Sequence, residues 1–299
     1  MVRDEVLKLR KEWAESDSQR DSGLTTPPNI TRIDDIKYGP AGWENLMDIY
    51  YLSDSKDKKN PVIVSIHGGA YVYGNKEVYQ FYCMSLAQRG FTVVNINYRL
   101  APESRFPSCL EDAESAISYI FAHRDEYPVD TDNIFMVGDS AGAHMAALYC
   151  CAATNSEYAD IIDFHPQKEH TPKAVVLNCG VYDIEQRIEH DQDNLFAPDL
   201  LGENWKENFD RLTNTGRYVT KDFPPTFIMS SSHDFLKYQL PKMKDILSKA
   251  GVEVFDKIYG DENTPELTHV FHCNMKLPMA KVCNDEECDF FKEHMGGSV

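Results

Sequence analysis

The feature that most constrains the fold is the pentapeptide Gly138-Asp139-Ser140-Ala141-Gly142. It follows an apolar run, Ile134 to Val137, and leads into small and helix-favouring residues, Ala143 to Leu148. A strand, a G-x-S-x-G turn and a helix in this order predict a sharp bend that presents the serine hydroxyl, with glycines where other backbone comes close. Ser140 is therefore the candidate nucleophile.

From Pro61 onward, short apolar runs alternate with segments of helical spacing. Buried strands that alternate with helices imply a mostly parallel sheet with helices on both faces. Functional sites in such α/β sheets form at the carboxyl ends of the strands. The expected strands are 30–38, 46–52, 62–66, 91–98, 134–137, 174–177, 226–230 and 252–258, and the expected helices are 78–89, 109–123, 141–153, 239–250 and 276–294.

The N-terminal segment precedes this pattern. Val6, Leu9 and Trp13 stand at helical spacing, which predicts an amphipathic helix over residues 1 to about 20 that packs on another part of the chain. The polar stretch Ser16–Pro28 is interpreted as a linker or loop. We expect residues 1–45 to form a cap or arm.

A second segment, Glu185–Phe223, interrupts the alternation; it is long, polar and punctuated by Pro198, Gly202 and Gly216. A structureless loop of this length is uncommon in a compact domain, so we expect a small helical insertion that acts as a lid. The predicted organisation is a catalytic domain of residues 46–184 and 224–299, covered by the N-terminal segment 1–45 and the cap insertion 185–223.

Composition excludes several classes of partner. The net charge of −18 argues against nucleic acid and against an anionic membrane, because both would repel the chain. The first residues are too charged for a signal peptide and no apolar run is long enough to cross a bilayer, so we expect a cytoplasmic protein. The eight cysteines lack a C-x-x-C pair and are expected as buried free thiols. The sequence leaves a homodimer open.

A second motif, His67-Gly68-Gly69-Ala70-Tyr71, follows the strand expected to end at Ile66. A glycine pair after a strand lets backbone N–H groups turn toward one point, where they can hold a developing oxyanion. The N–H of Ala141, directly after the candidate nucleophile, would supply a further donor. Without Ser140, the same residues would be interpreted as an ordinary glycine turn.

Two further blocks, Tyr98-Arg99-Leu100-Ala101-Pro102-Glu103 and Phe106-Pro107, lie between these motifs. Together, the blocks from His67 to Gly142 resemble the hormone-sensitive-lipase-like branch of the α/β-hydrolases, which includes bacterial carboxylesterases. The resemblance runs from Pro61 to the C-terminus and implies an α/β-hydrolase fold with a small helical cap. It assigns the oxyanion donors to Gly69, Ala70 and Ala141, and we include Gly68, the other glycine of the pair, in the candidate oxyanion hole.

A serine hydroxyl needs a base, and the base needs an orienting carboxylate. In this fold the order along the chain is serine, acid, histidine. Asp234 ends a strand after the insertion, and the resemblance supports it as the acid, whereas Asp183 and Asp222 are interpreted as loop or cap residues.

Two histidines, His269 and His272, remain as candidates for the base, in the loop after the last strand. The family reads H-G-F at this point, and His269-Val270-Phe271 aligns with it, with valine in place of the glycine. We predict that His269 is the base and that His272 packs against, or caps, the final helix.

The substrate pocket is less constrained by the sequence. The aromatic residues beside the motif loops and the apolar residues of the insertion either wall an acyl pocket or pack the lid onto the body, and both interpretations stay open. The candidates for the pocket are Tyr71, Tyr73, Phe106 and Phe196, with Leu195, Leu200 and Leu201.

The resemblance implies a serine carboxylesterase that acts on a small-molecule ester with a short acyl chain, without metal or organic cofactor. An arylformamidase, which would cleave an N-formyl amide with the same triad, is one alternative. A second alternative is a binding protein on the same scaffold, as in the plant gibberellin receptors, which lack a working histidine.

Overall fold

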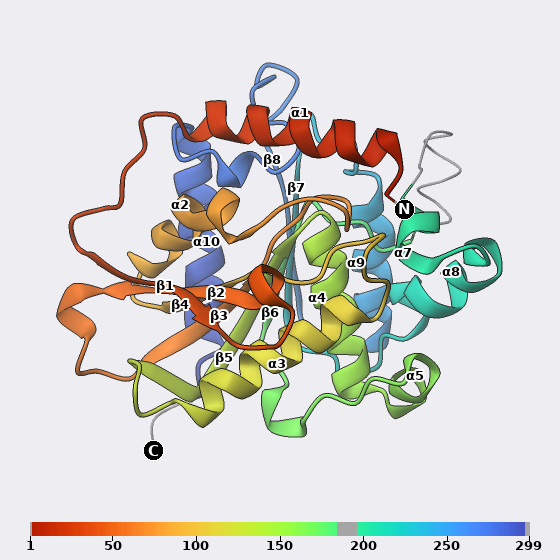
Figure 1. Cartoon of the computed structure of the whole chain (residues 1–299), viewed down its shortest axis with the longest axis horizontal. Coiled ribbons are helices and arrows are strands. Elements are labelled where there is room, and N and C mark those ends of the chain that lie inside the picture. The colour runs from red at the N-terminus through yellow and green to blue at the C-terminus, as the bar shows by residue number, and fades with distance from the viewer. Residues whose placement is uncertain (1, 184–195, 297–299) are drawn as a thin grey trace.

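An eight-stranded sheet forms the centre of the computed structural model, which describes residues 2–183 and 196–296. The strand order is β1-β2-β4-β3-β5-β6-β7-β8; β2 is antiparallel to β1 and β4, and the neighbours from β4 to β8 are parallel (Figure 1). The strands are β1 (Ile30–Lys37), β2 (Leu46–Leu52), β3 (Asn60–Ile66), β4 (Thr92–Ile96), β5 (Val129–Asp139), β6 (Val175–Asn178), β7 (Thr226–Ser231) and β8 (Val254–Tyr259).

Strand β3 explains why the sheet needs cover on both faces. Successive side chains of a strand point to opposite faces. Val62 and Val64 accordingly belong to one hydrophobic cluster and Ile63 to another, and all three are buried. The β-branched residues of β3 therefore pack into the hydrophobic cores on both faces of the sheet.

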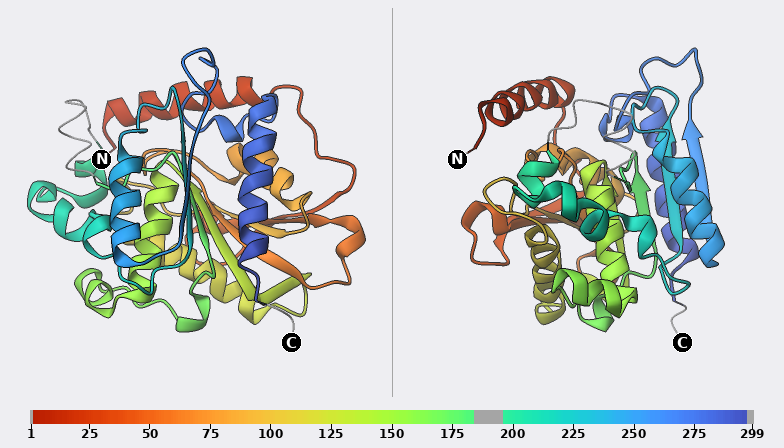
Figure 2. Two further views of the ribbon diagram at one scale, coloured as in Figure 1. Left: turned by 180° about the vertical axis from the view of Figure 1, so that it is seen from behind. Right: turned by 90° about the vertical axis from the view of Figure 1, so that its right-hand side faces the viewer.

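The helices divide between these two faces (Figure 2). α2 (Lys76–Ala87) and α10 (Pro278–Glu293) pack on the face of Ile63, whereas α3 (Ser108–Ala122), α4 (Ala141–Thr154) and α9 (Gln239–Ala250) pack on the other. Each helix and strand predicted from Pro61 onward has a counterpart. A further helix, α5 (Ser156–Ile162), was not predicted from the sequence.

Helix α1 (Asp4–Asp21) lies apart from these layers and crosses over the top of the molecule in Figure 1. The helix predicted near the N-terminus is thus present, but the interpretation of Ser16–Pro28 as a linker was wrong over its first six residues, 16–21. Polar contacts extend the helix: Asp17 accepts a hydrogen bond from Tyr73, and Arg20 donates to the carbonyl of Val78.

Within the segment expected as an insertion, residues 196–223 contain α7 (Ala197–Leu201) and α8 (Trp205–Thr213). Residues 184–195, including the pocket candidate Leu195, lie outside the described part. Among the described residues, no helix is long and apolar enough to span a membrane. The short 3-10 helices are η1 (Gly42–Asn45), η2 (Ser53–Ser55), η3 (Lys168–His170), η4 (Thr215–Arg217) and η5 (Phe271–Cys273).

Candidate active site

Ser140 occupies the sharp turn between β5 and α4. Its φ of 53° and ψ of −118° are unusual for a residue with a side chain, and its N–H donates to the carbonyl of Asn178 at 2.8 Å. The turn leaves no room at the flanking glycines: a Cβ on Gly138 would lie 2.3 Å from the carbonyl oxygen of Gly142, and one on Gly142 would lie 2.1 Å from that of Ile66. The two glycines therefore allow the bend that exposes the serine.

Asp234 and His269 form a hydrogen-bonded pair beside this turn. Asp234 follows β7 and His269 lies between β8 and η5, and the distance from His269 Nδ1 to Asp234 Oδ1 is 2.7 Å. The Asp234 carboxylate also accepts hydrogen bonds from the N–H of Leu236 at 2.9 Å and from Ser230 Oγ at 2.7 Å. Three donors thus converge on one buried carboxylate.

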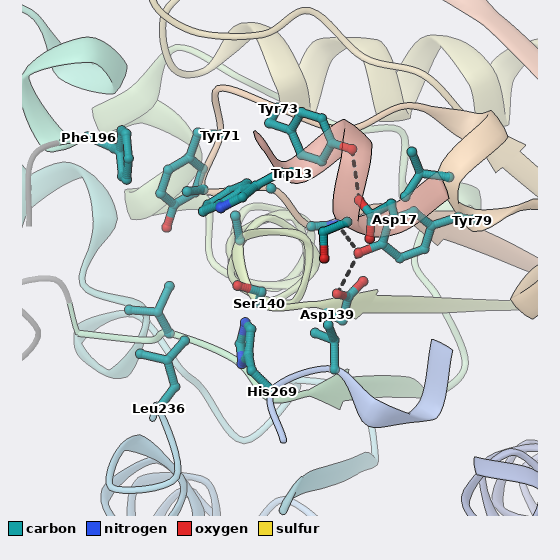
Figure 3. Close-up of a pocket in the computed structure, with 18 of the residues that line it drawn as sticks. Trp13, Asp17, Tyr71, Tyr73, Tyr79, Asp139, Ser140, Phe196, Leu236 and His269 are labelled. Carbon is teal, nitrogen blue, oxygen red and sulfur yellow. Dashed lines mark hydrogen bonds between the residues drawn. The ribbon is translucent and has the colours of Figure 1, made fainter. Parts of the chain in front are cut away.

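These donors keep the carboxylate ionised. Burial, the largest effect, raises the pKa of Asp234, but the hydrogen bond and charge of His269, with the bonds from Leu236 and Ser230, outweigh it and lower the pKa. An ionised carboxylate can only accept, so Nδ1 of His269 carries a proton, and in the neutral imidazole Nε2 then has the lone pair. In Figure 3 the ring of His269 lies next to Ser140.

His272 lies in a different environment. It is fully buried, its ring meets that of Tyr82 edge-on at 5.0 Å, and burial lowers its pKa to about 3. Between the two histidines, Val270 has a φ of 52° and a ψ of 33°. A valine therefore occupies the left-handed conformation that favours glycine.

The loop after β3 carries the candidate oxyanion donors. The N–H of Gly68 already donates to the hydroxyl of Tyr79 at 3.0 Å, so it is not free for a substrate oxygen. The N–H groups of Gly69, Ala70 and Ala141 make no hydrogen bond within the described residues. Ala70 has a φ of 51°, so its backbone is left-handed as well.

Two buried histidines, His67 and His144, make hydrogen bonds with residues of this loop. His67 Nδ1 donates to the carbonyl of Gly68 at 2.7 Å, and its ring stacks on that of Tyr98. His144, on α4, lies 2.6 Å from the Thr213 carbonyl through Nε2 and 2.6 Å from the Tyr71 hydroxyl through Nδ1. A carbonyl only accepts, so Nε2 is protonated and Nδ1 accepts from Tyr71. Burial lowers the pKa of both imidazoles to about 4, which keeps them neutral.

A cavity of about 420 Å³ opens in front of Ser140 and His269, and we call it the Ser140 cavity. Three of the pocket candidates, Tyr71, Tyr73 and Phe196, line it (Figure 3). Phe106, another pocket candidate, does not line this cavity; it borders a small gap beside Leu200, to whose carbonyl its N–H donates at 3.1 Å. Leu200 and Leu201 also lie outside the cavity lining.

Helix α1 contributes a wall that the sequence did not specify. Trp13, Ser16, Asp17 and Arg20 all line the Ser140 cavity. Trp13 meets Tyr73 edge-on at 5.6 Å, and Arg20 bridges Asp17 and Asp21. The helical spacing around Trp13 indicated a packed face, but no local signal indicated which surface that face would cover.

The remaining candidates lie elsewhere. Asp183 pairs with Lys242, and Asp222 is exposed beside Lys221.

All eight cysteines are buried and free, as predicted. Two groups of described residues have the spacing of metal ligands, Cys179 with Asp234 and His269, and Asp139 with His272 and Cys273. Burial raises the pKa of both thiols, Cys179 and Cys273, well above the usual value.

Comparison with known proteins places this chain in a family. The BD-FAE family model matches residues 47–239. Esterase LipQ of Mycobacterium tuberculosis is 29% identical over 241 residues, which are 74% of this chain and 55% of LipQ. The probable carboxylic ester hydrolase LipM of the same organism is 30% identical over 212 residues, 68% of this chain and 48% of LipM. The chain spans about half the length of these relatives.

Solved structures show the same fold. Esterase B from Lactobacillus rhamnosis has a TM-score of 0.88 at 22% identity, with 97% of this chain and 95% of that chain covered. A bacterial heroin esterase has a TM-score of 0.76 at 20% identity, with 98% and 92% covered. The predicted α/β-hydrolase fold is confirmed.

Proposed function

This chain belongs to the BD-FAE family of the α/β-hydrolase fold, and from that membership we propose that it is a serine carboxylesterase with Ser140 as its nucleophile. The observation that carries the proposal is the hydrogen bond between His269 and the buried Asp234, at the cavity that Ser140 lines. A serine, a histidine and a carboxylate arranged in this way can transfer an acyl group.

In the proposed reaction, Ser140 Oγ attacks the ester carbonyl while His269 Nε2 takes its proton. Asp234 orients the imidazole and stabilises its positive charge. The oxyanion is bound by the N–H groups of Gly69, Ala70 and Ala141. His269 returns the proton to the leaving alcohol. In the second half of the reaction, water attacks the acyl-enzyme while His269 takes its proton, and His269 then returns a proton to Ser140 Oγ as the acid leaves.

We propose esters with short acyl chains as substrates. The Ser140 cavity, at about 420 Å³, falls near the lower end of the range for small-molecule sites. Its lining is mostly apolar near Phe196 and Leu236 and polar near Asp17 and Arg20. Hydrolysis of soluble butyrate esters should therefore be faster than that of long-chain triglycerides.

The cap is proposed to consist of the N-terminal segment 1–45 and the insertion 185–223. Arg3, just before α1, is paired with Asp199 of α7, so the two segments touch. Within residues 1–45, α1 lines the Ser140 cavity, while β1 is an edge strand of the sheet.

The free thiols support a reducing compartment, and we propose a cytoplasmic location.

The alternatives are less well supported. A binding protein that has lost catalysis needs no oriented histidine, yet His269 is held by a buried carboxylate. An arylformamidase would use the same residues, but the relatives reported above are named as ester hydrolases. Comparing p-nitrophenyl butyrate with N-formylkynurenine as substrates separates the two enzymes.

The first test is covalent labelling with a fluorophosphonate probe, followed by peptide mapping. We expect the label on Ser140 and, in Ser140→Ala, a loss of ester hydrolysis on the order of 10⁶-fold with an unchanged melting temperature. Labelling of another serine, or retention of more than a small fraction of the activity, would contradict the assignment.

A further inference from the structure

Two hydrogen bonds meet at the hydroxyl of Tyr79, a residue of α2 that the proposed mechanism does not use. The hydroxyl donates to Asp139 Oδ2 at 2.7 Å and accepts from the N–H of Gly68 at 3.0 Å (Figure 3). We infer that Tyr79 is a positioning residue that holds the oxyanion loop at a fixed place relative to the nucleophile. This inference rests on the proposed esterase function.

The two partners of Tyr79 explain why it joins these parts. Gly68 directly precedes Gly69, a proposed oxyanion donor, and Asp139 directly precedes Ser140. A tyrosine hydroxyl has one proton and can accept through its lone pairs, so one group can satisfy a donor on one side and an acceptor on the other. We call these two hydrogen bonds of the Tyr79 hydroxyl the bridge. It connects the loop after β3, which carries Gly68, to the turn after β5, which carries Ser140.

The bridge is closely packed and shielded from water. Tyr79 and Asp139 are buried, at 6% and 2% exposure. A Cβ placed on Gly68 would lie 2.8 Å from Asp139 Oδ2 and 3.0 Å from the Tyr79 hydroxyl, so the backbone of the loop touches the bridge directly. Gly68, Tyr79 and Asp139 also line the Ser140 cavity, so the bridge lies at the proposed site itself.

Loss of the bridge should affect the transition state more than the bound substrate. The oxyanion donors act on charge that develops only as the tetrahedral intermediate forms. A donor displaced from its place therefore lowers kcat and leaves KM nearly unchanged. A tyrosine that served only the packing of α2 would change the stability and leave both constants alone.

The test compares Tyr79→Phe with Tyr82→Phe. Tyr82 lies one helical turn further along α2, is equally buried, and donates its hydroxyl to Glu287 instead of to the loop. With p-nitrophenyl butyrate, we expect Tyr79→Phe to lower kcat at least about ten-fold with KM changed less than two-fold, since removal of a whole oxyanion donor costs about 10² to 10³-fold. Tyr82→Phe should retain kcat.

A second pair of variants keeps Tyr79 in place. Asp139→Asn retains an oxygen that accepts the hydroxyl proton and should keep most of kcat, whereas Asp139→Ala should lower kcat as Tyr79→Phe does. The double variant Tyr79→Phe/Asp139→Ala should be no slower than the slower single variant, because both remove the same bridge.

The outcomes separate this inference from the proposed function. Equal kcat in Tyr79→Phe and the wild type, or equal kcat in Asp139→Asn and Asp139→Ala, would overturn the role of Tyr79 alone. An inactive wild type would instead overturn the proposed function. If Tyr79→Phe does not fold, as judged by its melting temperature, the two Asp139 variants give the answer.

Discussion

His269 and His272 differ in environment although only two residues separate them. The imidazole of His269 remains 19% exposed in its side chain and is bound to Asp234, whereas His272 is fully buried against Tyr82. The left-handed backbone of Val270 lies between them and turns the chain. The imidazole of His272 is neutral, since burial lowers its pKa to about 3, and it does not line the Ser140 cavity.

We therefore expect His269→Ala to lower kcat to near the level of Ser140→Ala, because both remove a member of one acyl-transfer unit. His272→Ala should keep most of kcat and lower the melting temperature instead, since it leaves a cavity in the core. Steady-state kinetics and thermal unfolding of both variants make the comparison. The reverse pattern of kcat would mean that the two assignments are exchanged.

The pocket candidates that line the Ser140 cavity from the oxyanion motif have local surroundings. Tyr71 and Tyr73 belong to the loop that carries the oxyanion motif, and their place beside the cavity follows from it. Phe106 also neighbours a motif, but its direction depends on how the chain turns toward Leu200, which no local pattern specifies. Asp17 and Arg20 come from a helix that reaches the site only through tertiary contacts.

At the scale of elements, α10 carries a buried acid on the face that it packs against the sheet. Glu287 accepts hydrogen bonds from Tyr82 at 2.7 Å and from Asn178 at 2.8 Å. Burial, the largest effect, raises its pKa to about 7 although these bonds and others lower it. The backbone carbonyl of Asn178 accepts a hydrogen bond from the N–H of Ser140. Glu287 is therefore linked through Asn178 to the turn that carries Ser140.

The raised pKa predicts how stability changes with pH. Between the unfolded pKa of about 4.3 and the folded pKa of about 7, the folded protein retains a proton that the unfolded chain releases, so the free energy of unfolding falls as pH rises through this window. The expected loss is on the order of 3 kcal/mol by pH 8.

Glu287→Gln should make the free energies of unfolding at pH 5 and pH 8 more nearly equal, because glutamine does not ionise. Urea denaturation at the two pH values measures the difference. The exposed Glu293→Gln, on the same helix, is the matched control and should retain the pH dependence of the wild type. An unchanged pH dependence in Glu287→Gln would show that another group causes the fall.

At this scale the sequence was most informative. The helices of the body were predicted because each must bury one face, which imposes a period of 3.6 residues. Its strands were predicted because they are buried on both faces and therefore form short apolar runs. Strand β5 is longer than its apolar run, since Val129 and Asp130 pair with Asn60 and Pro61 before the register shifts. Helix α1 ends at Asp21, close to the predicted end near residue 20, and its last turn is stabilised by contacts with distant residues.

For the whole molecule, α1 is attached mainly by charged side chains. Val6 is its one fully buried side chain among the described residues. Arg10 donates to the carbonyl of Val72 at 2.6 Å and pairs with Glu103 at 2.7 Å, while Arg3 pairs with Asp199. Part of each attachment faces solvent, where salt weakens attraction between charges.

Amide hydrogen exchange should therefore be faster in residues 4–21 than in α4, and 1 M NaCl should accelerate it in α1 selectively, because the screening length falls to about 3 Å. Arg10→Gln should have the same effect at low salt. Lys8→Gln, whose partner Glu12 lies on the same helix, should not. Equal exchange in Arg10→Gln and the wild type would exclude attachment through Arg10.

The attachment of α1 also bears on how such a protein can change over generations. The helix supplies Trp13, Asp17 and Arg20 to the cavity, yet it contributes little apolar area to either core. Substitutions on its inner face alter the surface that a substrate meets and leave the packing of the sheet as it was. Selection can therefore explore new substrates by varying one helix, while the nucleophile turn and the core that supports it stay fixed.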